Sequence, residues 1–244
     1  MKAKRHESFI RQHHKRIALV LKGLDAGLLK QHSCLFGGGT AIALRYGEYR
    51  ESVDIDFLVS ELSSYRDLRN QVRGSNGIEA IMKDNSNGEF QCSDVRSDQY
   101  GIRTKIFVEG QPVKFEIILE GRISLNQPGA KDRVLGVSTL TPLDMATSKL
   151  LANSDRGMNM GVHCRDVIDL AMMNLSRPAL LKAVEKAELA YGKAILIDLS
   201  KVTNLILKRD GLIDKCIKVM DISVPKALLW QNISKLRTVT LIEQ

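Results

Sequence analysis

Several features of membrane and secreted proteins are missing from this sequence of 244 residues. It contains no run of 18 or more apolar residues, so we expect no transmembrane helix and no membrane partner. The N-terminal residues are basic, but no apolar core or cleavage site follows them, so we expect no secretory signal peptide. Repeats and low-complexity tracts are also missing.

Cysteine is scarce and widely spaced. The four cysteines (Cys34, Cys92, Cys164 and Cys216) form no CxxC pair. This spacing argues against a zinc site and against a disulfide scaffold, and it fits a protein of the reducing cytoplasm.

The length suits one large domain or two small ones, and an apolar content of 44% is enough for a hydrophobic core. The net charge of +8 favours a polyanionic partner. The alternative is that this charge is ordinary variation in a soluble protein.

A glycine-rich segment, followed by two aspartates, is the most informative part of the chain. Gly37, Gly38 and Gly39 allow the backbone to approach a ligand closely. The amphipathic run that begins at Thr40 predicts a short helix, and the N–H groups at a helix N-terminus attract phosphate.

The next segment, residues 53–59, alternates between apolar and acidic side chains and predicts a strand. Asp54 and Asp56 are two positions apart, so they point to the same side, with Ile55 and Phe57 behind them. Two carboxylates about 7 Å apart suit a pair of Mg²⁺ ions separated by about 3.5–4 Å. The alternative is a glycine turn followed by two solvated aspartates at a sheet edge.

The order Gly38-Gly39, Arg50, Ser52 and Asp54-x-Asp56 resembles the polymerase-β-type nucleotidyltransferase superfamily. More narrowly, it is similar to the AbiEii/AbiGii toxin family of nucleotidyltransferases, over about residues 35–170. The resemblance implies an α/β (α+β) fold: a nucleotidyltransferase domain with a mixed sheet, which we place at residues 1–138, and a helical domain at 139–244.

The elements expected from periodicity agree with that division. Before residue 139 we expect helices over 7–30 and 64–73 and strands near 33–36, 90–95, 101–108 and 112–119. After it, Thr141 and Pro142 predict a helix start. Further helices are expected over 177–191, 193–209, 211–220 and 225–240, with Trp230 in their core. We interpret the adjacent His13 and His14 as surface or rim residues.

A third acidic candidate lies on the strand expected over residues 112–119, where Lys114 and Glu116 share one face. By resemblance, Glu116 is the third metal-binding carboxylate of the superfamily. Many members of the family carry aspartate there, and the extra methylene moves the oxygens by about 1.5 Å. The alternative is an exposed charge pair of Lys114 and Glu116.

Later basic and acidic residues complete the predicted site. Lys149 shares a helix stripe with Arg156, which suits a triphosphate, and the family has a lysine at this position. Asp166 and Asp169 share a helix face, in an element similar to the family's R-D-x-x-D-L. They either orient Lys149 and Arg156 or lie near the metals. The alternatives are a snorkelling lysine and a pair of aspartates at a helix N-terminus.

The resemblance implies Mg²⁺-dependent transfer of a nucleoside monophosphate from an NTP to an acceptor hydroxyl. Asp54, Asp56 and Glu116 would bind the metals, and Lys149 would neutralise the β and γ phosphates. Besides Lys149, the predicted nucleotide-binding residues are Gly38, Gly39, Thr40, Arg50, Ser52, Asp166 and Asp169.

The implied biological role is the toxin of a type IV toxin–antitoxin or abortive-infection system, with a separate antitoxin protein. We expect an RNA acceptor, most simply the 3′ end of a tRNA, bound by basic residues after position 177: Lys182, Lys186, Lys193, Lys201, Lys208 and Arg209. The rivals are nucleotidyl transfer to a protein or small molecule, and a non-catalytic RNA-binding protein on the same scaffold.

Overall fold

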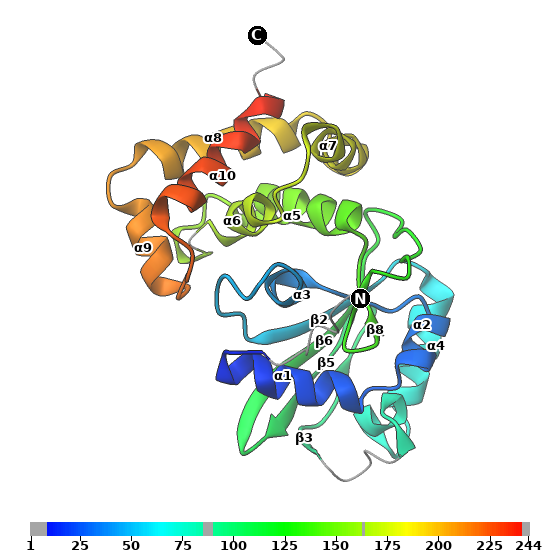
Figure 1. Ribbon diagram of the computed structural model, residues 1–244. Helices are drawn as coiled ribbons and strands as arrows, with labels where there is room; N and C mark the ends of the chain where they lie inside the picture. Colours follow the sequence, from blue (N-terminus) through cyan, green and yellow to red (C-terminus); the bar gives the residue numbers. More distant parts are fainter. Residues whose placement is uncertain (1–8, 85–89, 163, 241–244) are drawn as a thin grey trace, which may run out of the picture.

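The computed structural model describes residues 9–84, 90–162 and 164–240. Figure 1 shows two parts, a sheet flanked by helices below and a stack of helices above. The first helix of the upper part is α5 (Pro142–Arg156). The mixed α/β architecture expected from the sequence is confirmed.

The N-terminal segment forms two helices, so the single helix expected over residues 7–30 is wrong. They are α1 (Gln12–Gly23) and α2 (Ala26–Gln31). The Asp25 carboxylate accepts hydrogen bonds from the first backbone N–H groups of α2 and acts as its N-cap. A new helix start therefore interrupts the apolar periodicity. The first two positions of the expected helix lie outside the described residues.

The main sheet is mixed, as expected. Its strands are β1 (Leu35–Gly37), β2 (Asp54–Val59), β3 (Gln91–Cys92), β4 (Arg96–Ser97), β5 (Gly101–Val108) and β6 (Gln111–Leu119). Their spatial order is β1-β2-β6-β5-β3, with β4 also paired to β5. The pair β2–β6 is parallel, and the other pairs of this sheet are antiparallel. A separate hairpin consists of β7 (Arg133–Val134) and β8 (Val137–Ser138).

The register of β2 against β6 decides which side chains share a face. Asp54 lies opposite Lys114, and Asp56 lies opposite Glu116. The residues that alternate with them are completely buried, among them Ile55, Phe57, Phe115 and Ile117. One face of the sheet is therefore apolar and packed, while the other carries the charged residues of the predicted site.

Short helices connect these strands. The helix α3 (Gly38–Arg45) follows β1 without a linker and packs against β2. The helix α4 (Leu62–Val72) follows β2 and also contacts it, and the 3₁₀ turn η1 (Gly77–Ile81) packs on α4. The immediate step from β1 into α3 places the first turn of that helix beside the acidic strand.

The C-terminal helices fall close to their expected ranges. After α5 come α6 (Arg165–Met172), α7 (Arg177–Tyr191), α8 (Ala194–Lys208), α9 (Leu212–Val219) and α10 (Lys226–Thr240). Thr141 caps α5 by accepting a hydrogen bond from the N–H of Asp144, and Pro142 is the first helical residue, as predicted. The expectation for Trp230 is wrong, because its side chain on α10 is 49% exposed.

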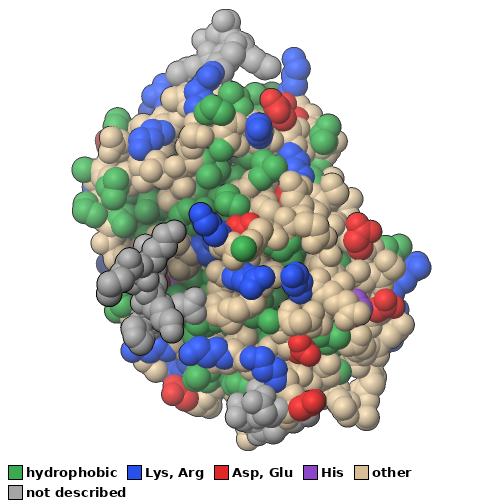
Figure 2. Space-filling view, turned by 45° about the vertical axis from the view of Figure 1, so that its right-hand side comes forward, with side chains coloured by type: hydrophobic (Ala, Val, Ile, Leu, Met, Phe, Trp, Pro, Cys, Tyr) green, Lys and Arg blue, Asp and Glu red, His purple; other side chains and the backbone are tan. Residues whose placement is uncertain are grey.

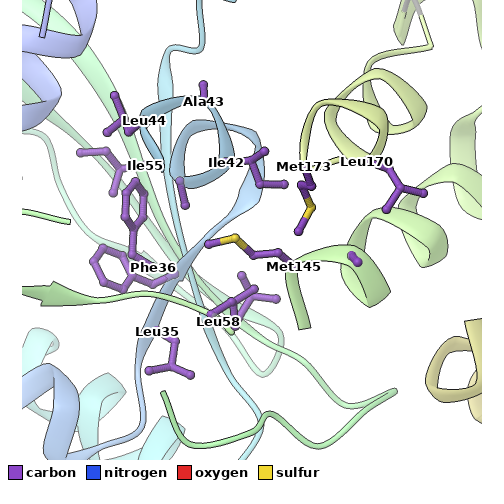
Figure 3. Packing of buried hydrophobic residues seen from close by; sticks show 14 of the residues in the cluster. Leu35, Phe36, Ile42, Ala43, Leu44, Ile55, Leu58, Met145, Leu170 and Met173 are labelled. Carbon is purple, nitrogen blue, oxygen red and sulfur yellow. The ribbon is translucent and has the colours of Figure 1, made fainter. Parts of the chain in front are cut away.

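Hydrophobic packing joins the two parts. Figure 3 shows Met145 of α5 reaching toward Ile42 of α3 and Leu58 of β2, with Met173 beside Ile42. These residues belong to one cluster of buried side chains that runs through both parts of the described chain. The helices that carry the basic residues are thus fixed against the sheet. The division into domains at residue 139 stays a proposal.

Candidate active site

A cleft of about 490 Å³ lies between the charged face of the sheet and the helices α5, α6 and α9. Eight of the predicted site residues line it: Gly38, Gly39, Arg50, Ser52, Asp54, Asp56, Glu116 and Lys149. The other three, Thr40, Asp166 and Asp169, are buried next to it and do not form its wall.

The glycines at the start of α3 are required by close contacts. Gly38 has a positive φ of 67°, and a Cβ atom there would lie 2.3 Å from an Asp56 carboxylate oxygen. A Cβ atom on Gly39 would lie 2.2 Å from the Arg50 guanidinium. Because any side chain would collide with these groups, the turn brings bare backbone against the acidic strand. The helix begins at Gly38, two residues before its expected start at Thr40.

Thr40 supports the cleft wall from behind. Its side chain is 1% exposed, and its hydroxyl donates a 2.8 Å hydrogen bond to the Ser52 hydroxyl. Ser52 lies in the loop that connects α3 to β2 and is itself half-buried at the cleft. Thr40 therefore fixes the Ser52 side chain from behind the cleft wall.

The side chains of Asp54 and Asp56 are half-buried. Within the described ranges of the chain, neither carboxylate forms a hydrogen bond or an ion pair. Burial raises the pKa of Asp56, and the neighbouring charges of Asp54 and Glu116 raise it further. Hard carboxylate oxygens that repel each other are suitable ligands for a divalent cation such as Mg²⁺.

Glu116 differs from these two aspartates because both of its oxygens have cationic partners. One lies 2.7 Å from Lys114 Nζ, and the other lies 3.2 Å from Arg103 Nε. Lys114 is the partner that the charge-pair alternative named, whereas Arg103 is added by the pairing of β5 with β6. In the parts of the chain described, no set of three acidic, cysteine or histidine side chains is arranged to hold a metal.

Lys149 is buried between two aspartates of α6. Its Nζ lies 2.9 Å from an Asp166 oxygen and 2.7 Å from an Asp169 oxygen. Arg156 forms two further hydrogen bonds to Asp166, of 2.8 and 3.0 Å. Burial opposes the charged form of Asp166, but Lys149 and Arg156 outweigh it and hold its pKa far below the usual range. The two aspartates therefore contact the basic residues, which is the first of the two alternatives for them.

Arg50 is anchored by the same helix. Its guanidinium forms hydrogen bonds of 2.6 and 2.9 Å to both oxygens of Asp169, and the Tyr49 hydroxyl donates a third bond of 2.6 Å. Arg50 is only 5% exposed and Asp169 is fully buried. Burial disfavours the charged guanidinium, but Asp169 reverses the effect and raises the pKa of Arg50. Arg50 thus ties the loop before β2 to α6.

The cleft also contains residues that are not among the predicted site residues. Arg122 bonds to both oxygens of the buried Glu120, to Asp155 and to the Tyr191 hydroxyl. Arg165 lines the cleft and has no ion pair with any described residue. The buried Ser148 hydroxyl also faces the cleft without a partner there. The position of Arg165 beside Asp166 was the only local signal for any of them.

A family model described as "Nucleotidyl transferase AbiEii toxin, Type IV TA system" matches residues 21–217. The chain belongs to this family. It is therefore a nucleotidyltransferase of the AbiEii toxin family, as the sequence motifs indicated. Among curated proteins, none matches the sequence.

Two solved structures are similar to the AbiEii-family chain. JHP933 from Helicobacter pylori is 17% identical, with a TM-score of 0.50, and the alignment covers 96% of this chain and 95% of that one. A second H. pylori structure, provisionally designated a nucleotidyltransferase, is 18% identical, with a TM-score of 0.49 over 93% of this chain and 94% of its own. At such identity, JHP933 supports the fold alone.

None of the helices within the described ranges combines the length and hydropathy that crossing a membrane needs.

Proposed function

We propose that this AbiEii-family protein transfers a nucleoside monophosphate from an NTP to an acceptor hydroxyl. The observation that carries the proposal is the contrast across the cleft: on one wall, Asp54 and Asp56 form no ion pair with any described residue, and on the other lies Lys149. The acceptor oxygen would bond to the α-phosphorus, the bond from that phosphorus to the β-phosphate oxygen would break, and pyrophosphate would leave. The hydroxyl proton would pass to water.

Asp54 and Asp56 are the residues that would hold Mg²⁺. When bound, the metal would offset the charge of the triphosphate and lower the pKa of the acceptor hydroxyl. Glu116 is the third candidate ligand, and it would have to exchange its ion pairs with Lys114 and Arg103 for the metal. The two aspartates fit a metal as they stand, whereas Glu116 fits only after such an exchange.

The phosphates would lie between the start of α3 and Lys149. The backbone N–H groups at Gly38 and Gly39 and the Ser52 hydroxyl are suitable donors to phosphate oxygens. Lys149 would neutralise the β and γ phosphates, held in place by Asp166 and Asp169. Positioning and charge neutralisation would supply most of the rate enhancement.

We propose RNA as the acceptor, with the 3′ end of a tRNA as the first candidate. The net charge of +8 supports a polyanionic partner. On the face of the molecule in Figure 2, lysine and arginine side chains are spread over both the upper and the lower part. Of the basic residues expected to bind RNA, Lys186 and Lys201 form ion pairs with Asp144 and Asp198. The exposed ones are Lys182, Lys193, Lys201, Lys208 and Arg209.

A second basic region lies closer to the carboxylates. The face of the sheet that carries Asp54 continues in register through Lys114 of β6 and Lys105 of β5, and Arg96 of β4 shares this face opposite Arg103. Lys105 and Arg96 are exposed and have no ion pair with any residue described. This row leads out of the cleft from the proposed metal site, so it offers phosphate contacts to an acceptor strand.

The family description implies an NTP substrate and a type IV antitoxin as partner. We propose that the chain acts as the toxin and that a separate protein is its antitoxin. Two rivals are nucleotidyl transfer to a protein or small molecule, and RNA binding without catalysis. The raised pKa of Asp56 favours the catalytic interpretations, because burial, Asp54 and Glu116 together outweigh the favourable charges of Lys149 and Lys114, and a bound cation would relieve this repulsion.

One labelling experiment separates the alternatives. The protein would be incubated with Mg²⁺ and each α-labelled NTP, together with purified tRNA, tRNA whose 3′ ribose has been oxidised, or cell lysate. We expect label in intact tRNA and none in oxidised tRNA. Label in the protein fraction of the lysate would favour the protein rival, and no label in any fraction would favour RNA binding alone.

A further inference from the structure

Two adjacent histidines of α1 contact the loop that leads into β2. The His14 side chain is fully buried, so its expected place at the surface is wrong, while His13 is half-buried. The backbone N–H of Ser52 donates a 3.1 Å hydrogen bond to His14 Nε2. His13 Nε2 lies 3.0 Å from the carbonyl oxygen of Val53. The two rings therefore hold consecutive residues directly before Asp54.

The hydrogen-bond partners fix the protonation of both rings. A backbone N–H can only donate, so His14 Nε2 must be an unprotonated acceptor and the ring proton lies on Nδ1. That proton is donated to a Glu48 carboxylate oxygen at 2.8 Å. The Val53 carbonyl can only accept, so His13 Nε2 must carry a proton. His14 thus holds its partner only when it is neutral, whereas His13 holds its partner in either charge state.

Glu48 fastens this arrangement to the start of α1. Besides His14, its carboxylate accepts hydrogen bonds from the backbone N–H groups of Ile10 and Arg11, at 2.8 and 3.3 Å. Burial opposes its ionisation, but these donors and His14 outweigh it and lower the pKa of Glu48. The carboxylate therefore stays charged and keeps His14 in the tautomer that accepts from Ser52.

The loop before β2 has anchors on both sides of the cleft. Arg50 and Tyr49 bind Asp169 of α6, and Thr40 of α3 binds the Ser52 hydroxyl. The bond from His14 is the contact that fixes the Ser52 main chain from the opposite side, through α1. Removing it leaves a part-buried N–H without its acceptor at the point where the loop becomes the acidic strand.

We propose that His14 is a positioning residue for the nucleotide site, which holds the Ser52 main chain so that Ser52 and Asp54 face the phosphates. This inference rests on the proposed function for the role of those two residues. Its chemical signature is loss of the Ser52 contact when His14 is protonated, since two N–H groups would then face each other.

Other groups near His14 agree with a neutral ring. Its burial lowers its pKa, and this effect exceeds the opposing effects of the Glu48 and Glu51 carboxylates, while Arg11 lowers it further. Arg11 is itself held by Asp221 and by the carbonyl of Glu48. Acidification below the ordinary value of 6.5 is therefore needed to charge His14 in the folded protein.

The first test compares variants by the affinity for a non-hydrolysable NTP analogue with Mg²⁺ at pH 7.5. His14→Phe keeps a ring of similar size but removes both hydrogen bonds, and we expect binding about tenfold weaker. His14→Gln retains an oxygen that can accept from Ser52, and its affinity should return to within about threefold of the parent. His32→Ala is the control, because His32 contacts Gln71 and lies outside this loop and the cleft, and its affinity should stay within about twofold of the parent. Equal affinity of His14→Phe and the parent overturns the inference.

The second test needs no nucleotide and stays decisive if His14→Phe fails to fold. The Ser52 amide resonance of the ¹⁵N-labelled protein is followed from pH 7.5 to pH 5. We expect it to titrate together with the His14 ring in the parent and to stay flat in His14→Gln. A Ser52 resonance that stays flat while the His14 ring itself titrates overturns the inference. If the resonance titrates but the parent binds no NTP, the proposed function fails while the coupling of His14 to Ser52 stands.

Discussion

One pair of aspartates lines the cleft and a second pair is buried behind it, and the two pairs have opposite environments. Asp54 and Asp56 are two residues apart on a strand, and neither has a cation partner in the described chain. Asp166 and Asp169 are three residues apart on a helix and bind Lys149, Arg156 and Arg50. Burial opposes the charged form of Asp56, Asp166 and Asp169. The pKa of Asp56 is raised, whereas the cations hold those of Asp166 and Asp169 below their usual range.

The difference separates a binding role from a supporting role. Carboxylates saturated with arginine and lysine have no free oxygen for a metal, and they stabilise the arrangement of those cations. Carboxylates that repel each other gain stability only when a cation arrives. Substitutions in the first pair should therefore affect catalysis and metal binding, and substitutions in the second pair should affect folding.

The largest expected effect is on catalysis at Asp54. Replacing it by Ala removes a ligand that the proposed Mg²⁺ requires, so transfer should fall by about a thousandfold or more. The melting temperature should change by less than about 2 °C, because the carboxylate forms no contact that stabilises the fold. Asp198→Ala is the control for the loss of an aspartate elsewhere, because it removes only an ion pair with Lys201. Full activity of a folded Asp54→Ala protein contradicts the metal assignment.

The next effect is on stability at Asp169. In Asp169→Asn, the buried Arg50 and Lys149 lose the charge that compensates theirs, and we expect a loss of about 3–5 kcal/mol in the free energy of unfolding. Urea denaturation measures this loss. The same substitution at Asp166 should cost less, because Arg156 is 40% exposed and is partly solvated. A loss below about 1 kcal/mol at Asp169 would show that the pair is not structural.

The third prediction concerns Lys149 of α5, which should control the affinity for the nucleotide. Lys149→Met keeps the apolar stem but removes the charge, so NTP binding should weaken about 10- to 100-fold. Binding of the acceptor, titrated separately, should hardly change. Lys186→Met is a matched control, because Lys186 is also a poorly exposed helix lysine on an aspartate, outside the cleft. Unchanged NTP affinity in Lys149→Met rules out the phosphate role.

The comparison also shows what the sequence could and could not predict. The shared strand face of Asp54 and Asp56 can be predicted because alternation along one strand is local. The stripe of Lys149 and the shared face of Asp166 and Asp169 follow in the same way from helix geometry. The helix boundaries after residue 139 depend on caps and periodicity, which are equally local.

Long-range contacts were invisible for a physical reason. Arg50 meets Asp169 across 119 residues, and Ser52 meets His14 across 38, so only tertiary packing decides these pairs. Glu116 shows both cases. Its bond to Lys114 follows from the strand spacing, whereas its bond to Arg103 depends on the register of β5. Tertiary packing also places Thr40 behind the cleft wall, where its hydroxyl binds Ser52. No local sequence pattern predicts this position.

The smallest and most diagnostic effect concerns the stability of Asp56→Asn. Because the folded pKa of Asp56 is raised, the folded state binds its proton more readily than the unfolded chain does. This contribution to stability is therefore lost as the pH rises from the ordinary value of 3.8 through the folded pKa. The lowered pKa values of Asp166 and Asp169 act with the opposite sign, since their contribution is lost as the pH falls below that same value.

At neutral pH without metal, Asp56→Asn should raise the melting temperature by about 1–3 °C, because it removes a carboxylate that is repelled by Asp54 and Glu116. Adding Mg²⁺ should stabilise the parent and leave the variant unchanged, since a ligand that binds only the folded state raises its stability. Calorimetric melting of both proteins at neutral and acidic pH, with and without Mg²⁺, measures how the substitution, the pH and the metal each change the melting temperature. A variant that melts below the metal-free parent at neutral pH would mean that Asp56 has a stabilising partner, as Asp169 has, and the distinction between the two pairs would be lost.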